Sequence, residues 1–230
     1  MIAAADFPWY LPHWQFFQKM LHADIFLIAD DFPFRPKLRI NRTGIRTAGG
    51  RQWLTVPVLK KNRGEQSIRE VAINPASAWR QKHWKSLAIA YQGAAYFEKF
   101  DQDFARLYQR EWQSLFELNL ETIRLVRELL GIATPMVFFS KISAESSGGS
   151  TLVQGLQAVG AKEYLCEENT VPEGIKTELA RAGISLRAAN TSSYPGPWHQ
   201  LFDPFIADLS IVDMLFNEGV DCLNILKSGI

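Results

Sequence analysis

Residues 2–31 read IAAADFPWYLPHWQFFQKMLHADIFLIADD, and this stretch decides the fold. Residues 2–5 form a short apolar run that is typical of a buried strand. Residues 11–23 carry large apolar side chains at spacings of three and four, which is the period of a helix. Residues 24–30 are a second apolar run, closed by paired acids. Strand, helix and strand within about thirty residues indicate a βαβ unit and therefore a parallel sheet.

The chain continues with an insertion that has the character of a β-hairpin. Residues 52–58 are rich in β-branched and aromatic side chains, and we expect residues 68–73 to pair with them antiparallel. After three helical patterns, strands and helices alternate, with strands expected at residues 134–140, 163–166 and 184–187. The sequence therefore predicts an α/β fold: an open, mainly parallel (Rossmann-like) sheet with helices on both faces and a β-hairpin insertion after the first βαβ unit. Because no linker divides the chain, we expect one domain over residues 1–230.

The composition is that of an ordinary globular protein. Apolar residues make up 47% of the chain and charged residues 21%, so a core can form. The formal net charge of +1 gives no reason to expect nucleic acid as a partner. No segment approaches the ~20 apolar residues of a membrane span, and the first residues lack the pattern of a signal peptide, so we expect a cytoplasmic protein. Scattered histidines and two cysteines predict no metal site, and no motif identifies a cofactor.

The loop after the first strand is the first candidate for a ligand site. In open α/β sheets, ligands bind beyond the carboxyl ends of the strands, where a helix N-terminus offers free N–H groups. Asp6, Tyr10 and His13 lie in this loop. His13 and Asp6 could act as an acid–base pair, since imidazole titrates near neutral pH. In the alternative interpretation, the prolines and aromatic residues of the loop simply pack a rigid turn.

Two acids follow the second strand. Because side chains alternate along a strand, one of Asp30 and Asp31 can point into a pocket and the other away from it. They could bind a sugar hydroxyl, an amine or Mg²⁺, and they could handle protons. The alternative is that one of them caps the next turn.

Arginines are concentrated after the second strand. Alternation places Arg39 and Asn41 on one face and Arg42 with Arg46 on the other. Guanidinium forks match the geometry of phosphate, so a phosphorylated small molecule or a nucleotide-sugar pyrophosphate is the expected ligand. A solvated basic hairpin is the alternative.

A helical pattern at residues 79–91 supplies the third candidate group. His83 lies on its inner face and is the histidine we favour for acid–base work, and Trp84 could stack on a sugar or base. The alternative places the tryptophans of this helix in the core. A Ser210, His199 and Asp213 triad is not favoured, because no GxSxG elbow is present and Ser210 suits a helix cap.

Several short motifs follow one another along nearly the whole chain in the order in which a known family carries them. They include Pro8-Trp-Tyr-Leu-Pro12, Asn41-Arg42, Gln52-Trp-Leu-Thr-Val-Pro-Val58, Lys82-His83-Trp84-Lys85, Ser140 and Leu209-Ser-Ile-Val-Asp-Met-Leu-Phe-Asn-Glu-Gly219. In this combination the chain resembles the WbqC-like proteins. Such proteins occur in bacteria, often among genes for surface polysaccharides and modified sugars. We therefore add Lys85, Ser140 and Asp213 to the candidate ligand-binding residues.

The chain also departs from the pattern of the proteins it resembles. Phe7 replaces a usual glutamine, Gln15 a glycine, Arg39 an aromatic residue and Gly44 an arginine, and Cys166 stands where a glycine is usual soon after Tyr164. Three hypotheses follow. The first is an enzyme of polysaccharide or modified-sugar biosynthesis that transfers a group to or from an activated sugar or similar phosphorylated metabolite. The second is a non-catalytic binding or accessory protein, and the third, weaker, is a hydrolase.

Overall fold

The computed structural model describes residues 1–35, 38–59, 65–142, 151–167, 170–189 and 198–228. Its strands are β1 (Ile2–Asp6), β2 (Ile25–Ile28), β3 (Arg42–Thr47), β4 (Gly50–Thr55), β5 (Met136–Phe138), β6 (Glu163–Glu167) and β7 (Ser185–Ala189). Its helices are α1 (Trp14–Leu21), α2 (Trp79–Tyr91), α3 (Phe97–Gln109), α4 (Leu115–Leu130), α5 (Thr151–Ala158), α6 (Glu173–Arg181), α7 (Ile211–Glu218) and α8 (Cys222–Lys227).

Five of the described strands form a parallel sheet in the order β5-β2-β1-β6-β7. β1 lies in the middle because it pairs in parallel with both β2 and β6. In chain order, β2 and then β5 are added on one side of β1, and β6 and then β7 are added on the other side of β1. The strand order therefore reverses between β1 and β6, which is the place where open α/β sheets bind ligands.

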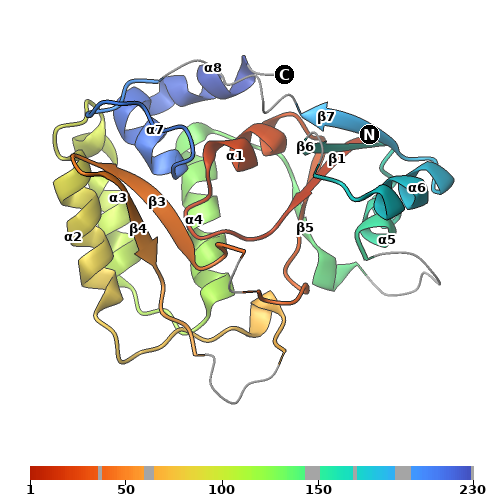
Figure 1. The fold of residues 1–230 in the computed structure, drawn as a ribbon, viewed down its shortest axis with the longest axis horizontal. Coiled ribbons are helices and arrows are strands. Elements are labelled where there is room, and N and C mark those ends of the chain that lie inside the picture. Colours follow the sequence, from red (N-terminus) through yellow and green to blue (C-terminus); the bar gives the residue numbers. More distant parts are fainter. Residues whose placement is uncertain (36–37, 60–64, 143–150, 168–169, 190–197, 229–230) are drawn as a thin grey trace.

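Helices cover both faces of the sheet, as predicted. Successive side chains of a strand point to opposite faces of the sheet, so each strand contributes to an apolar cluster on either face. Phe26 and Leu165 belong to the cluster that contains the aromatic side chains of α1, whereas Leu27 and Tyr164 belong to the cluster that contains apolar side chains of α5 and α6. Figure 1 shows α5 and α6 together at one end of the molecule, with α1 on the other side of β1. The predicted α/β architecture is confirmed.

The β-hairpin is present, but its strands differ from the predicted pair. β3 and β4 pair antiparallel from Arg42–Thr55 to Thr47–Gly50, around a tight turn. The predicted pairing of residues 52–58 with residues 68–73 is wrong: among the described residues it is reduced to a single bridge between Val58 and Ile73. Pro57 has no N–H to donate to a ladder, so the second pairing cannot extend.

The hairpin belongs to the helical half of the molecule. β3 packs against α2 and α7, and Figure 1 shows the hairpin on the same side of the molecule as α2 and α3, away from β6 and β7. α7 begins at Ile211, and Ser210 serves as its N-cap. No helix in the described parts of the chain has the length and apolar character needed to cross a membrane.

Candidate functional site

The loop between β1 and α1, residues 7–13, is held in one conformation by buried polar groups. Leu11 has φ 42°, a left-handed conformation that leucine rarely adopts. Its carbonyl accepts hydrogen bonds from the hydroxyls of Thr43 at 2.9 Å and Ser210 at 3.0 Å. Asn119 of α4 donates to the carbonyl of Pro8 in the loop at 2.7 Å and to that of Ile40 beside it at 2.9 Å. Strain of this kind costs about 1–3 kcal/mol and is concentrated where a loop must present a fixed geometry.

The carboxyl ends of β1, β2 and β6 border a cavity of about 400 Å³, which we call the switch-point cavity. Its size is in the range of small-molecule sites. Its aromatic wall consists of Phe7, Trp9, Phe32, Phe139 and Tyr164. Its polar lining consists of Asp6, His13, Lys19, Glu167 and Thr170. An aromatic cavity with a few convergent polar groups is the usual form of a metabolite site.

A buried ion pair forms part of the polar lining. Lys19 Nζ lies 2.6 Å from Asp6 Oδ2 and 3.4 Å from Glu167 Oε1. Burial alone lowers the pKa of Lys19, but the carboxylates of Asp6 and Glu167 outweigh it and raise that pKa above its ordinary value. Lys19 is therefore a fixed cation at neutral pH and not a nucleophile. The other oxygen of Asp6 accepts from the N–H of Phe7 at 2.8 Å and the indole of Trp9 at 2.6 Å.

His13 lines both the switch-point cavity and a second pocket. Its Nδ1 is buried and has no hydrogen-bond partner within the described part of the chain. Burial lowers the pKa of His13, while the nearby Asp6 carboxylate opposes the shift. The imidazole is therefore neutral at pH 7 and able to accept a proton. The hydrogen bonds of the Asp6 carboxylate go to Lys19 and to the loop, so the Asp6 charge acts on His13 through space.

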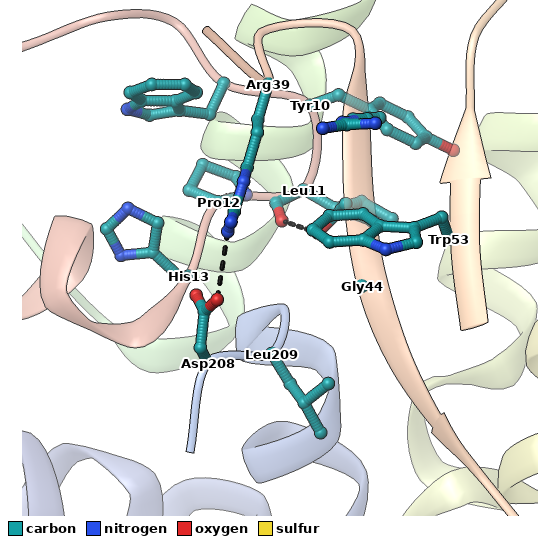
Figure 2. Close-up of a pocket in the computed structure, with 12 residues that line it drawn as sticks. Tyr10, Leu11, Pro12, His13, Arg39, Gly44, Trp53, Asp208 and Leu209 are labelled. Carbon is teal, nitrogen blue, oxygen red and sulfur yellow. Dashed lines mark hydrogen bonds and ion pairs between the residues drawn. The ribbon is translucent and has the colours of Figure 1, made fainter. Parts of the chain in front are cut away.

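The second pocket, which we call the arginine pocket, has a volume of about 210 Å³ and lies between the loop, the hairpin and the segment before α7. Arg39, Arg42 and Arg51 place their guanidinium carbons 4.9, 4.7 and 5.5 Å from the centroid of a Trp53 ring. In Figure 2, Arg39 reaches across the pocket to Asp208, with His13 and Trp53 on opposite sides. The three guanidinium groups are therefore held close together by cation–π contacts with Trp53.

The arginine pocket carries more positive than negative charge. Among the described residues that line it, Asp208 is the carboxylate. Its Oδ2 forms ion pairs with Arg39 at 2.9 Å and with Arg51 at 3.4 Å. Arg42 has no carboxylate partner among the described residues, and its buried Nε makes no hydrogen bond there. A guanidinium without a counter-ion beside an open pocket has the charge and the donor geometry that phosphate binding requires.

The structure brings several of the predicted site residues together. Asp6 and His13 line the switch-point cavity, and Tyr10, His13, Arg39 and Arg42 line the arginine pocket. The roles proposed for them in ligand binding and catalysis stay predictions. No group of three or more His, Cys, Asp or Glu residues in the described ranges is arranged to hold a metal ion.

Asp30 and Ser140 also meet, just outside the switch-point cavity. The Asp30 carboxylate accepts a hydrogen bond from the Ser140 N–H at 3.0 Å and one from its hydroxyl at 2.5 Å. Their chain neighbours Ala29 and Phe139 line the cavity, whereas Asp30 is buried behind its wall. Asp31 is exposed. This geometry gives Asp30 the role of joining the ends of β2 and β5.

His83 lies behind the arginine pocket instead of in its lining. Its Nδ1 is hydrogen-bonded to the Tyr10 hydroxyl at 3.0 Å, and that hydroxyl is bonded in turn to the hydroxyl of Tyr108. Burial lowers the pKa of His83 to about 4, against an opposing hydrogen bond to the backbone of Thr55. His83 is thus a neutral, buried side chain that connects α2 to the loop.

The buried His83 predicts a pH dependence of stability. Because its pKa is about 4 in the folded protein and 6.5 ordinarily, the unfolded chain binds the extra proton first as the pH falls. The stabilisation is complete above pH 6.5 and is lost progressively toward pH 4, by about 3 kcal/mol in all. We expect the unfolding free energy of the His83→Gln variant, from urea titrations at pH 7.5, 5.5 and 4.5, to fall less steeply than that of the wild type. Parallel slopes for the two proteins would contradict the assignment.

Arg46 and Asp213 are fully buried and bind the protein itself. The Arg46 guanidinium donates to the carbonyls of Phe202 and Pro204 at 2.9 to 3.2 Å, which fixes the segment that leads to Asp208. Asp213 accepts hydrogen bonds from the side chains of Tyr91, Trp198 and Gln200. Burial raises the pKa of Asp213, and these three donors oppose the shift. His199 is exposed and bonds to Glu218, so no Ser210, His199 and Asp213 triad forms.

The remaining predicted residues lie outside the lining of both pockets. Asn41 is buried and donates to the carbonyl of Val56 at 2.8 Å. Trp84 stacks on Phe97 and Tyr108, which is the core role weighed against ligand stacking. Lys85 is exposed on α2. The ligand contacts expected of Asn41, Trp84 and Lys85 stay predictions.

Sequence reasoning missed Lys19, Trp53, Glu167 and Asp208. The role of Lys19 could have been predicted from the sequence, because a lysine on the buried face of a helix such as α1 needs an anionic partner. Trp53 and Asp208 had none, since each is an ordinary surface residue until β4 and the segment before α7 come together. Glu167 follows the apolar residues of β6, and local sequence alone does not show that this strand end lies beside Lys19.

The site and fold together define a Rossmann-like α/β protein with a candidate small-molecule site at the reversal of its strand order. More particularly, the chain belongs to the WbqC-like protein family, which matches residues 8–225. It is 29% identical over 228 residues to an uncharacterized protein of Mycobacterium tuberculosis, Rv1507c, in an alignment that covers 95% of this chain and 94% of the relative. No solved structure matches the chain. The family resemblance read from the sequence is confirmed.

Gly44 of β3 lies against an arginine of β4. A Cβ atom at Gly44 would lie 3.1 Å from Cδ of Arg51, so the stem of Arg51 occupies the space beside this glycine. Arg51 lies on β4, and its guanidinium reaches Asp208 in the arginine pocket. Arg51, from the opposite strand of the hairpin, thus fills the space beside Gly44 and extends toward Asp208.

Proposed function

We propose that this protein is an enzyme that transfers a group to or from a nucleotide-sugar or another phosphorylated metabolite, in the biosynthesis of bacterial surface polysaccharides or modified sugars. The observation that carries the proposal is the adjacency of the two pockets. The arginine pocket, with its unmatched Arg42, and the switch-point cavity share Trp9 and His13 as lining residues. Membership of the WbqC-like family supports the biosynthetic setting.

Each group of the site has a role in such a transfer. Arg42, with Arg39 beside it, holds the phosphate, and the transferred group or its acceptor lies against the aromatic wall of the switch-point cavity. As the acceptor oxygen or nitrogen forms its bond to the transferred group, its proton passes to His13. The bond to the leaving phosphate oxygen breaks, and its electron pair stays with the phosphate, where the guanidinium groups balance the charge. The geometry favours His13 over His83 as the base.

A thermal-shift screen tests the proposal first. Nucleotides, nucleotide-sugars and sugar phosphates at millimolar concentration are expected to raise the unfolding temperature, because a ligand at 100 times its Kd stabilises the folded state by about 2.7 kcal/mol. Ligands that bind are then incubated with alcohol and amine acceptors, and products are sought by mass spectrometry. Binding without turnover would favour the non-catalytic alternative, and the absence of any stabilisation would contradict the proposal.

Replacing Arg42 with alanine is expected to weaken the binding of a phosphorylated ligand by about 10- to 100-fold, since hydrogen bonds to charged groups contribute about 1.5–3 kcal/mol. The matched control is Arg124→Ala, which removes an exposed arginine of α4 that pairs with Glu121 on its own helix. Isothermal titration calorimetry of both variants supplies the measurement. Equal affinities for the two variants would show that the phosphate binds elsewhere.

A further inference from the structure

The charges in the switch-point cavity do not balance among its described lining residues. Asp6 and Glu167 supply two carboxylates, and Lys19 supplies one ammonium group. Lys19 is closer to Asp6, at 2.6 Å, than to Glu167, at 3.4 Å. Both oxygens of Asp6 are occupied by Lys19 and by N–H donors of the loop. The surplus negative charge therefore resides on Glu167.

Glu167 is placed to meet a ligand. Its side chain is 33% exposed, against 7% for Lys19 and 10% for Asp6. Oε1 faces Lys19, and Oε2 makes no ion pair or hydrogen bond within the described part of the chain. An ionised carboxylate has about four acceptor sites, so Glu167 keeps most of its capacity for a bound group.

A second polar side chain of the cavity, Tyr164, also has hydrogen-bonding capacity left for a ligand. Tyr164 lies on β6, is only 8% exposed and lines the cavity. No hydrogen bond joins its hydroxyl to a residue that the structure describes, so the hydroxyl is free to donate to and accept from a group bound in the cavity. Around both groups stands the aromatic wall. An aromatic surface beside the Tyr164 hydroxyl and Oε2 of Glu167 suits a sugar ring that carries hydroxyl groups and a protonated amine.

We infer that the switch-point cavity takes the sugar half of the ligand and that Glu167 selects an amino sugar. The inference rests on the proposed function, because phosphate in the adjoining arginine pocket sets the orientation of the ligand. A ligand that fills the cavity removes water from Glu167, and a protonated amine compensates for that loss. A sugar with a carboxylate instead adds a like charge beside Glu167 and Asp6, which repels it.

Three sugar phosphates that differ at one position test the inference without requiring the correct nucleotide. Glucosamine 1-phosphate, glucose 1-phosphate and glucuronic acid 1-phosphate are titrated by calorimetry at pH 6.5, where a sugar amine is protonated. Wild-type protein is expected to bind glucosamine 1-phosphate about tenfold or more tightly than glucose 1-phosphate, and glucuronic acid 1-phosphate most weakly. Equal affinity for the three would overturn the inference but leave the proposed function intact. Failure of all three to bind would also overturn the inference, whereas the proposed function fails only if the thermal-shift screen of nucleotides and nucleotide-sugars shows no stabilisation as well.

The Glu167→Gln variant separates selection by Glu167 from other causes. It is expected to fold, because Lys19 keeps Asp6, and to lose the preference for the amine while still binding glucose 1-phosphate. Glu163→Gln, at the opposite end of β6, is the matched control and is expected to keep the preference. A Glu167→Gln protein that still prefers glucosamine 1-phosphate would assign the selection to another residue and overturn the inference.

Discussion

Replacing His13 with glutamine is expected to lower turnover by about 10²- to 10⁴-fold, the range that a positioned general base contributes, while the Kd for the phosphorylated ligand stays close to that of the wild type. His13 lines both pockets and its Nδ1 bonds to no described residue, so its loss removes a proton acceptor without breaking a hydrogen bond of that atom. Steady-state kinetics give the turnover, and calorimetry gives the Kd. His199→Gln, which alters an exposed histidine, is the control.

The same residue predicts the pH profile. Burial lowers the pKa of His13 below its ordinary value, with the Asp6 carboxylate opposing the shift. The base is active in its neutral form, so turnover is expected to stay constant as the pH falls through the ordinary range of histidine and to decline only below it. The His13→Gln protein lacks this decline. Unchanged turnover in that variant, or a pH profile shared by both proteins, would remove His13 from the mechanism.

Replacing Lys19 with methionine is expected to reduce the unfolding free energy by about 3–5 kcal/mol, because breaking a buried ion pair leaves its partner charge uncompensated. The uncompensated charge is that of Asp6, whose side chain is 10% exposed. Methionine has a similar length and fits the apolar surroundings of α1, so the loss of charge dominates over the loss of packing. Urea unfolding followed by circular dichroism measures the change.

A double variant distinguishes this electrostatic explanation from simple packing damage. Asp6→Asn keeps an oxygen that can accept the N–H groups of Phe7 and Trp9, but it carries no charge. The Lys19→Met, Asp6→Asn double variant is therefore expected to be more stable than Lys19→Met alone. A double variant that is less stable than the single one would show that Lys19 acts through packing and not through its charge.

The architecture could be predicted from local sequence because it depends on periodicity. Buried strands and amphipathic helices alternate along the chain, and parallel strands gather their carboxyl ends at one edge, so the sequence alone is enough to place Asp6 and His13 there. The hairpin partner could not be predicted in this way, since β4 had two available neighbours and only the tight turn at residues 47–50 decides between them.

The arrangement of the site depends on contacts between distant segments, which periodicity does not encode. Arg39 meets Asp208 across 169 positions of sequence, and Glu167 joins Lys19 only because β6 crosses to the far side of β1. His83 shows the converse. Its position on the inner face of α2 was predicted correctly, but an inner face can adjoin a pocket or the core, and here Tyr10 separates His83 from the lining of the arginine pocket.

A crystal structure with glucosamine 1-phosphate bound tests the central claim most directly, because the claim is that the two pockets form a single ligand site. We predict the phosphate within hydrogen-bond distance of Arg42, the sugar ring against Trp9 in the switch-point cavity, and His13 between them. A ligand bound at another surface, with both pockets empty at saturating concentration, would contradict the account.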